Sequence, residues 1–397
     1  MAAIAGVDTT PAGWRVVFAC FVSAVFAWGF GFYAHGIYLV ELRKAHDWST
    51  GLISSVITGH YVLGALLLPR IADAIGRFGP RAVFLGGLAI TGGPLLLLPS
   101  VTEPWQLALL YALMAAGWNA TSVAPIAATI GQWFDRKRGL ALNLALSGAT
   151  VAGLVVAPTL LALIPRLGFA AAEQLAVIVG LVLAMVAVAM FVREGPLVVR
   201  QATAARPATW APLRRWHFWS ISAAFAFVLM SQVGFLTHLV PMLADRPHVD
   251  PGLAVAINAV AALLGRVVLG FVIDRLEPRR ASALCFLVQV AAMAALARAE
   301  HALLIYAACA LYGFSVGNNI TLSPLIIQRE FPAAQFPAIV ALSTAVVQIL
   351  YAFGPGLLGI LRDASGDYGG PLAVCIALNL AATAVVLARP HRLSPGT

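Results

Sequence analysis

The stretch Gly117-Trp118-Asn119-Ala120-Thr121 returns 200 residues later as Gly317-Asn318-Asn319-Ile320-Thr321. In the same way, Gly31-Phe32-Tyr33-Ala34-His35 returns as Gly234-Phe235-Leu236-Thr237-His238, at an offset of 203 residues. A nearly constant offset indicates that the chain contains a duplicated unit. Duplicated hydrophobic units build many membrane transporters, in which the central binding site lies between the repeats. The duplication therefore predicts where a binding site should be sought.

The composition excludes an ordinary soluble protein. The 397 residues are 61% hydrophobic and only 10% charged, whereas about 25% of the residues of a soluble protein are charged. A core cannot hide so much apolar side chain from water, so the sequence predicts an integral membrane protein. The net charge of +9 does not indicate a nucleic-acid partner, because the basic residues are scattered among loops. The cysteines lie inside apolar runs and are expected to pack there, rather than to form disulfides or bind a metal: Cys20, Cys285, Cys309 and Cys375.

Twelve apolar runs are long enough to cross a bilayer, which takes roughly 20 residues of helix. The sequence therefore predicts an all-α integral membrane protein with twelve transmembrane helices in two pseudo-symmetric six-helix bundles. The bundles are expected at residues 1–192 and 216–397, joined by a Pro- and Arg-rich cytoplasmic linker at 193–215. The first run lacks a short apolar segment with a cleavage site, so it is expected to be a retained span. The predicted spans cover about 14–40, 50–72, 81–101, 104–130, 139–164, 169–192, 216–243, 251–273, 280–298, 302–327, 335–361 and 369–388.

The basic residues are divided unevenly between the two sides of these spans. With the N-terminus inside, the inner segments hold 18 Lys and Arg residues and the outer loops hold 6. Cytoplasmic loops carry an excess of basic residues. Both termini are therefore expected in the cytoplasm, and the protein is expected in a bacterial-type inner membrane. The one basic residue left over is Arg266.

Arg266 lies in the middle of the eighth predicted span, at a depth of roughly 12 Å. An arginine at the centre of a span costs roughly 2.5–3.5 kcal/mol. One interpretation is a structural arginine bonded to carbonyl or hydroxyl groups of a neighbouring helix. The other is an arginine that faces a polar cavity and binds an anion. Alignment of the repeats places Ala65 opposite Arg266, as expected of an asymmetric ligand in a pseudo-symmetric site.

The predicted spans offer Arg266 no acidic partner. The Asp and Glu residues fall in loops or at span ends, Glu173 and Glu330 included. An unpaired buried guanidinium is poorly tolerated, so a mobile anion is the expected partner. The planar guanidinium fork suits a carboxylate. A single intramembrane cation therefore predicts a small organic acid with one carboxylate as the substrate.

His35 and His238 occupy equivalent positions in the first and seventh predicted spans. A lone His on an apolar helix is usually a packing residue, but a repeated pair favours positions in the cavity. Burial beside Arg266 favours neutral imidazole in the empty site, and an entering carboxylate favours the charged form. Anion and proton would then move together, which makes His35 and His238 candidate proton carriers.

Asn119 and Tyr33 complete the candidate substrate site. Asn119 is repeated as Asn319, which fits either a shared site or shared packing between helices. Tyr33 fits either the lining of an amphipathic cavity or the ordinary core. With Arg266, His35 and His238, they form the set of residues expected to bind substrate.

Two segments resemble the signature Gly-x-x-x-Asp-Arg-x-Gly-Arg-Arg of the major facilitator superfamily. The first runs from Pro69 to Arg81, and the second runs from Gly270 to Arg280. The resemblance implies the twelve-helix fold over the whole chain. It also implies a cytoplasmic latch that breaks as the two halves rock, with Asp73, Arg77, Arg81, Arg138, Asp274 and Arg275 as candidates.

A narrower resemblance precedes the fifth span. Residues 133–148, from Trp133-Phe134 to Ser147-Gly148, are similar to the monocarboxylate transporter pattern aromatic-Phe-x-x-Arg-Arg-x-Leu-Ala-x-Gly-Leu-Ala-x-Ala-Gly. In that family an arginine of span eight binds the carboxylate, which implies this role for Arg266. Ala262 stands where the family often has its proton-carrying acid. The related oxalate–formate exchangers use a lysine in span eleven, and residues 335–361 contain none.

These observations predict a secondary transporter of an organic monocarboxylate that is coupled to protons and works by alternating access. The alternative is a drug or amphipathic-solute exporter of the same fold. Cation exporters usually need a membrane-embedded acid, however, and no span centre has one. An enzyme is not expected, because no catalytic spacing is present. The expected partners are the substrate, the proton and the lipid bilayer, with no cofactor and no metal, and the expected state is a monomer.

Overall fold

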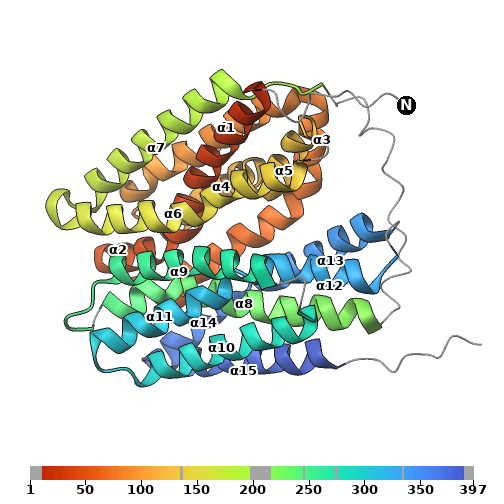
Figure 1. Ribbon diagram of the computed structural model, residues 1–397. Helices are drawn as coiled ribbons and strands as arrows, with labels where there is room; N and C mark the ends of the chain where they lie inside the picture. The colour runs from red at the N-terminus through yellow and green to blue at the C-terminus, as the bar shows by residue number, and fades with distance from the viewer. Residues whose placement is uncertain are drawn as a thin grey trace, which may run out of the picture.

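The described part of the chain forms two helical bundles that lie side by side (Figure 1). The computed structural model describes residues 11–134, 137–196, 216–244, 246–272, 276–332 and 335–388. Within these residues, 12 helical segments are long and apolar enough to cross a membrane, and no strand is present. The predicted fold class is confirmed. The predicted linker lies largely outside the described residues, so the domain boundaries at 193 and 215 stay predictions.

The N-terminal bundle contains α1 to α7, and the C-terminal bundle contains α8 to α15. We call the side at which α1 and α8 begin and α7 and α15 end the termini side, and the other end of the bundles the opposite side (Figure 1). The helices are α1 (Pro11–Trp28), a π-helical turn η2 (Gly29–Tyr33), α2 (His35–His46), α3 (Thr50–Leu97), a 3-10 turn η3 (Leu98–Ser100), α4 (Pro104–Ala120), α5 (Val123–Gly131), α6 (Arg138–Leu167), α7 (Phe169–Phe191), α8 (Trp216–Ala244), α9 (Pro251–Val272), α10 (Pro278–Arg298), α11 (Ala302–Val316), α12 (Asn319–Glu330), α13 (Phe336–Tyr351), α14 (Gly354–Ser365) and α15 (Gly369–Leu387).

The second and third spans form one nearly continuous helical run, α3, which reverses at Gly79. This residue has φ 77° and ψ 161°, a backbone conformation that glycine adopts without a steric penalty. The two membrane-spanning parts of α3 are Thr50–Leu68 and Asp73–Ser100, the second of which includes η3. The turn thus lies where the sequence predicts the loop between spans two and three.

The repeated segments 117–121 and 317–321 each lie at a helix break, one in each bundle. In the fourth span, α4 ends at Ala120 and α5 begins at Val123. In the tenth span, α11 ends at Val316 and α12 begins at Asn319. Interrupted helices expose backbone groups at mid-membrane depth, which is tolerated where they are buried in protein or line a cavity. The duplication is therefore visible in the structure as well as in the sequence.

Three glycines allow α9 and α11 to approach closely. A Cβ atom at Gly265 would overlap the backbone carbonyl of Phe314, and one at Gly313 would overlap that of Asn258. A Cβ atom at Gly317 would overlap a carbonyl of α9 in the same way. Because Gly265 precedes Arg266, this close packing brings the arginine beside the break in the tenth span.

Candidate functional site

Arg266 lies at the interface between the two bundles. Its Nε donates a hydrogen bond to the carbonyl of Gly317 at 2.7 Å, in its own bundle. Its Nη1 donates to the hydroxyl of Thr150 at 2.9 Å, and Thr150 belongs to α6 of the N-terminal bundle. The guanidinium therefore connects the two halves of the molecule.

These two bonds leave much of the guanidinium without a protein partner. Arginine carries five N–H donors, and two of them are engaged by described residues. No described Asp or Glu forms an ion pair with Arg266. The side chain is half-buried. The structure thus contains the carbonyl and hydroxyl contacts of the structural interpretation, and it also leaves donors free for an anion.

Tyr33 lies close to Arg266. The phenol is within electrostatic range of the guanidinium, and its ring packs against Gly153, one turn of α6 from Thr150. Tyr33 ends the π-helical turn η2 of the first span, and π-helical turns inside helices are frequent at functional sites. The structure therefore brings together two of the predicted site residues, Tyr33 and Arg266.

His35 lies elsewhere, inside the N-terminal bundle. It is fully buried, and its Nδ1 lies 3.3 Å from the hydroxyl of Tyr61. Its ring centroid lies 5.6 Å from that of His60 and 5.4 Å from that of Tyr111. His35 thus belongs to a cluster of aromatic and imidazole side chains.

His238 is buried at the bundle interface. Its Nε2 lies 3.0 Å from the carbonyl oxygen of Pro355 and 3.3 Å from the hydroxyl of Ser54 in the N-terminal bundle. Its Nδ1 lies 3.3 Å from the hydroxyl of Tyr368. The two histidines are equivalent in sequence, but they have different surroundings.

Asn119 packs within its own bundle. Its amide nitrogen donates to the carbonyl of Ala115 at 2.8 Å, and the same amide fills the space beside Gly64 of α3. Its counterpart Asn319 instead donates to Gln232 at 3.1 Å. The repeated asparagines therefore make different contacts.

An open cavity of about 470 Å³ lies between α3 and α4. None of the five predicted substrate residues lines it. Its walls are formed by Leu52, Ser55, Val56, Gly59, His60, Ala108 and Ala112. Of the polar residues around His35, His60 reaches this cavity.

Hydrogen bonds between the bundles gather toward the opposite side. Asp363 of α14 accepts hydrogen bonds from the backbone N–H groups of Thr50 at 3.1 Å and Gly51 at 2.5 Å, at the start of α3. Further along α3, Thr58 accepts from the N–H of Gly356 at 2.9 Å. Asp363 thus caps a helix of the other bundle, where the positive end of the helix dipole favours a carboxylate.

The candidate latch residues lie on the termini side. Asp73, Arg77, Arg81 and Arg138 are exposed. None of these four forms an ion pair with another described residue. Asp274 and Arg275 lie outside the described residues. The latch therefore stays a prediction.

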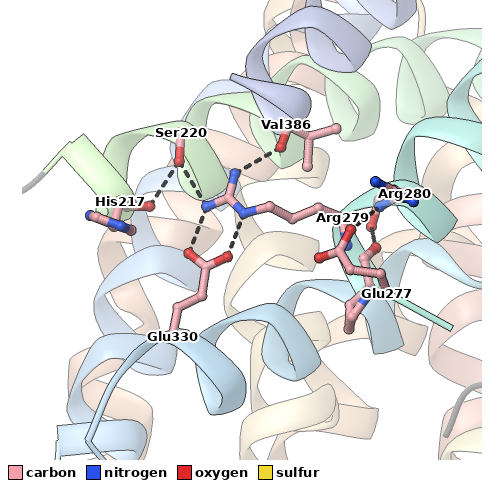
Figure 2. Close-up of polar contacts among 9 residues, drawn as sticks. His217, Ser220, Glu277, Arg279, Arg280, Glu330 and Val386 are labelled. Carbon is pink, nitrogen blue, oxygen red and sulfur yellow. Dashed lines mark hydrogen bonds and ion pairs between the residues drawn. The ribbon is translucent and has the colours of Figure 1, made fainter. Parts of the chain in front are cut away.

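A different ion pair closes the termini side of the C-terminal bundle (Figure 2). Arg279, at the start of α10, donates to both carboxylate oxygens of Glu330 at the end of α12, at 2.5 and 2.7 Å. The same guanidinium donates to the hydroxyl of Ser220 on α8 at 3.0 Å and to the carbonyl of Val386 on α15 at 2.8 Å. One side chain thus joins four spans.

The fold and these contacts can be compared with known proteins. A family model described as Major Facilitator Superfamily matches residues 16–355 and 250–396. The chain belongs to the major facilitator superfamily. Members of this superfamily are transporters, so the chain is a multi-pass membrane transporter, as the sequence predicts.

Two relatives and one solved structure are similar to this chain over most of its length. Monocarboxylate transporter 13 of Rattus norvegicus is 25% identical over 393 residues, which cover 96% of this chain and 90% of the rat protein. MFS-type transporter 1 of Ophiocordyceps sp. is 28% identical over 353 residues, which cover 83% and 76%. A bacterial homologue of the human lysosomal transporter Spinster, in an inward-facing and occupied conformation, matches with a TM-score of 0.75 and 15% identity, over 96% of this chain and 97% of its own. The two relatives come from a fungus and a mammal. The location in a bacterial-type inner membrane and the cytoplasmic position of both termini therefore stay predictions.

Three residues at key contacts were not predicted as site residues. Thr150 and Asp363 each connect the two bundles. Neither stands out among the other polar residues of the sequence, because Thr150 lies mid-way along the fifth span and Asp363 lies near the end of the eleventh. Glu173 was assigned to a span end, but the structure buries it completely in α7. A signal was present, because Glu173 is the one charged residue of that 23-residue apolar helix.

Proposed function

We propose that this superfamily member transports an organic monocarboxylate and that Arg266 binds its carboxylate. The observation that carries the proposal is a guanidinium at the bundle interface, with free N–H donors and no described carboxylate partner. A guanidinium binds a carboxylate through two parallel charge-assisted hydrogen bonds. The relatives named as monocarboxylate transporters support the same substrate class.

Tyr33 and Thr150 would complete this site. The hydroxyl of Tyr33 lies within electrostatic range of Arg266 and supplies one further donor for a carboxylate oxygen. Thr150 belongs to the N-terminal bundle, whereas Arg266 belongs to the C-terminal bundle. Movement of the bundles would therefore change the surroundings of a bound anion, as alternating access requires.

The hydrogen bonds between the bundles support a conformation that is closed on the opposite side. Asp363 and Thr58 both contribute to this closure through backbone N–H groups of the other bundle. Between Arg266 and the termini side, no hydrogen bond between described residues joins the two bundles. We infer that these contacts form a gate that opens when the bundles rock the other way.

Replacing Asp363 by alanine is expected to shift the protein toward the state that is open on the opposite side. The substitution removes two charge-assisted hydrogen bonds between bundles, and loss of about 1.4 kcal/mol changes a two-state ratio about tenfold. The shift is measured by double electron–electron resonance between spin labels at Thr102→Cys and Glu300→Cys, in a Cys285→Ser background. Both labelled positions are exposed and lie on the opposite side, one in each bundle.

Asp367→Ala is the matched control for this measurement. Asp367 lies four residues further along the chain, between α14 and α15, and accepts a hydrogen bond from Gly369 in its own bundle. The control should leave the distance distribution unchanged. A distribution that stays unchanged in Asp363→Ala would show that this contact does not hold the gate closed.

The transported substrate is tested with purified protein and a panel of organic acids. A monocarboxylate such as lactate, pyruvate or benzoate is expected to raise the melting temperature, because a ligand that binds the folded state stabilises it. The acid with the largest effect should then accumulate in proteoliposomes when an inward proton gradient is imposed. Stabilisation by tetraphenylphosphonium, a lipophilic cation, and by no acid would instead favour the exporter alternative.

Proton coupling belongs to this proposal as well. His35 and His238 stay the candidates that the sequence suggested. His238 has three polar neighbours at the bundle interface, including Ser54. The Nε2 of His35 has no hydrogen-bond partner among the described residues. Of the variants His35→Gln and His238→Gln, the first is therefore the more informative test of whether uptake depends on the proton gradient.

A further inference from the structure

Glu173 is a fully buried carboxyl group that substrate binding by Arg266 does not explain. It lies five residues into α7, and its exposed fraction is 0%. Its Oε1 accepts a hydrogen bond of 2.6 Å from the hydroxyl of Tyr38 on α2. Its Oε2 has no hydrogen-bond partner among the described residues. The group therefore has one neutral partner.

These surroundings favour the carboxylic acid over the carboxylate. Removing an ionised carboxylate from water carries a large free-energy cost unless a cation or several donors compensate it. No described Lys or Arg forms an ion pair with Glu173. The titratable groups within electrostatic range are Tyr38 from α2 and Tyr111 from α4, and both are phenols. A phenol donates one hydrogen bond but supplies no positive charge.

The N-terminal bundle contains other buried polar atoms without partners, and Tyr111 is within electrostatic range of Glu173. The hydroxyl of Tyr111, the Nε2 of His35 and the Nε2 of His60 all have no hydrogen-bond partner among the described residues. The ring centroid of Tyr111 lies 5.4 Å from that of His35 and 5.9 Å from that of His60. An unpaired buried polar group costs about 1–3 kcal/mol, so several in one cluster point to a function.

This cluster borders the cavity between α3 and α4 through His60. The His60 ring lies 5.6 Å from the His35 ring and lines the cavity between α3 and α4. Its Nδ1 lies 3.1 Å from the carbonyl oxygen of Tyr111. Neighbouring groups that can accept or donate protons thus lie between the cavity and Glu173: His60, His35 and Tyr111.

We propose that Glu173 is a proton-binding site of the N-terminal bundle, reached from the cavity between α3 and α4 through His60, His35 and Tyr111. The proton resides on the carboxyl group in this conformation, and Tyr38 holds the group in place. On release, the proton passes to water in the cavity and leaves a carboxylate. Use of this proton in coupled transport rests on the proposed function, whereas protonation of Glu173 does not.

Infrared difference spectroscopy of the purified protein tests the proposal without any organic acid. At neutral pH, wild type minus Glu173→Gln should show the C=O stretching band of a protonated carboxylic acid. Glu300→Gln is the matched control, because Glu300 is an exposed glutamate in the loop between α10 and α11. Absence of a wild-type band that Glu173→Gln removes would overturn the proposal.

Two further variants test the surroundings of the proton. Tyr38→Phe removes the donor to Oε1, so the band should persist at higher frequency, and an unshifted band would contradict the role of Tyr38.

In D2O the band should shift as the proton exchanges, and His60→Phe should slow this exchange severalfold. An unchanged exchange rate would overturn the route through His60. Arg266 takes no part in these measurements. A negative infrared result would therefore leave carboxylate binding by Arg266 untouched, and loss of that binding role would leave the protonation of Glu173 untouched.

Discussion

Arg266→Ala is expected to weaken binding of the organic acid by at least about 100-fold and to abolish its uptake. Each hydrogen bond to a charged group contributes about 1.5–3 kcal/mol, and every 1.4 kcal/mol changes affinity tenfold. The alanine variant loses both donors of a two-point contact. Affinity is measured by titration calorimetry with the acid that the panel selects, and uptake is measured in proteoliposomes.

Arg266→Lys and Arg298→Ala are the matched variants. Lysine keeps the charge but lacks the planar fork, so it should restore part of the affinity. Arg298 is exposed at the end of α10, and its removal should leave binding unchanged. Undiminished binding or uptake by Arg266→Ala would overturn the assignment of the carboxylate site.

Thr150→Val separates the anion-binding role of Arg266 from a structural role. The variant removes the acceptor of the 2.9 Å bond between bundles but keeps the guanidinium. If Arg266 only joins the bundles, both Thr150→Val and Arg266→Ala should lower the melting temperature without changing affinity. If Arg266 binds the substrate, Arg266→Ala should lose far more affinity than Thr150→Val, which keeps the guanidinium.

Repeated residues predicted the architecture because helix length and helix breaks depend on local sequence. Asn119 and Asn319 lie beside interruptions of spans four and ten, which is why the duplication remained visible. Gly79 likewise adopts a positive φ at the position where the sequence predicts a turn between spans. These features need no information about which helices pack together.

The contacts between elements could not be predicted in the same way. His35 and His238 have equivalent sequence positions, but one lies inside a bundle and the other contacts Ser54 across the interface. Glu173 is near the end of a span in sequence, and only the packing of α7 beside Tyr38 shows that it is buried. The depth of Arg266 could be estimated from spacing, whereas its bond to Thr150 depends on how two bundles meet.

Arg279→Ala is expected to destabilise the C-terminal bundle by about 3 kcal/mol. Removing one partner of a buried ion pair costs about 3–5 kcal/mol, and the lower end applies because the Glu330 side chain is 22% exposed. The substitution also leaves the hydroxyl of Ser220 and the carbonyl of Val386 without their donor (Figure 2). The expected result is a lower apparent melting temperature in detergent and a lower yield of folded protein.

Arg280→Ala and a double variant complete this experiment. The Arg280 side chain is exposed beside Arg279, so its removal should leave the melting temperature within error of wild type. Arg279→Met combined with Glu330→Met removes both charges, so it should be more stable than Arg279→Ala, in which the carboxylate is left unpaired. Equal melting temperatures for Arg279→Ala and wild type would mean that water replaces the ion pair and that the four spans are held together by apolar packing alone.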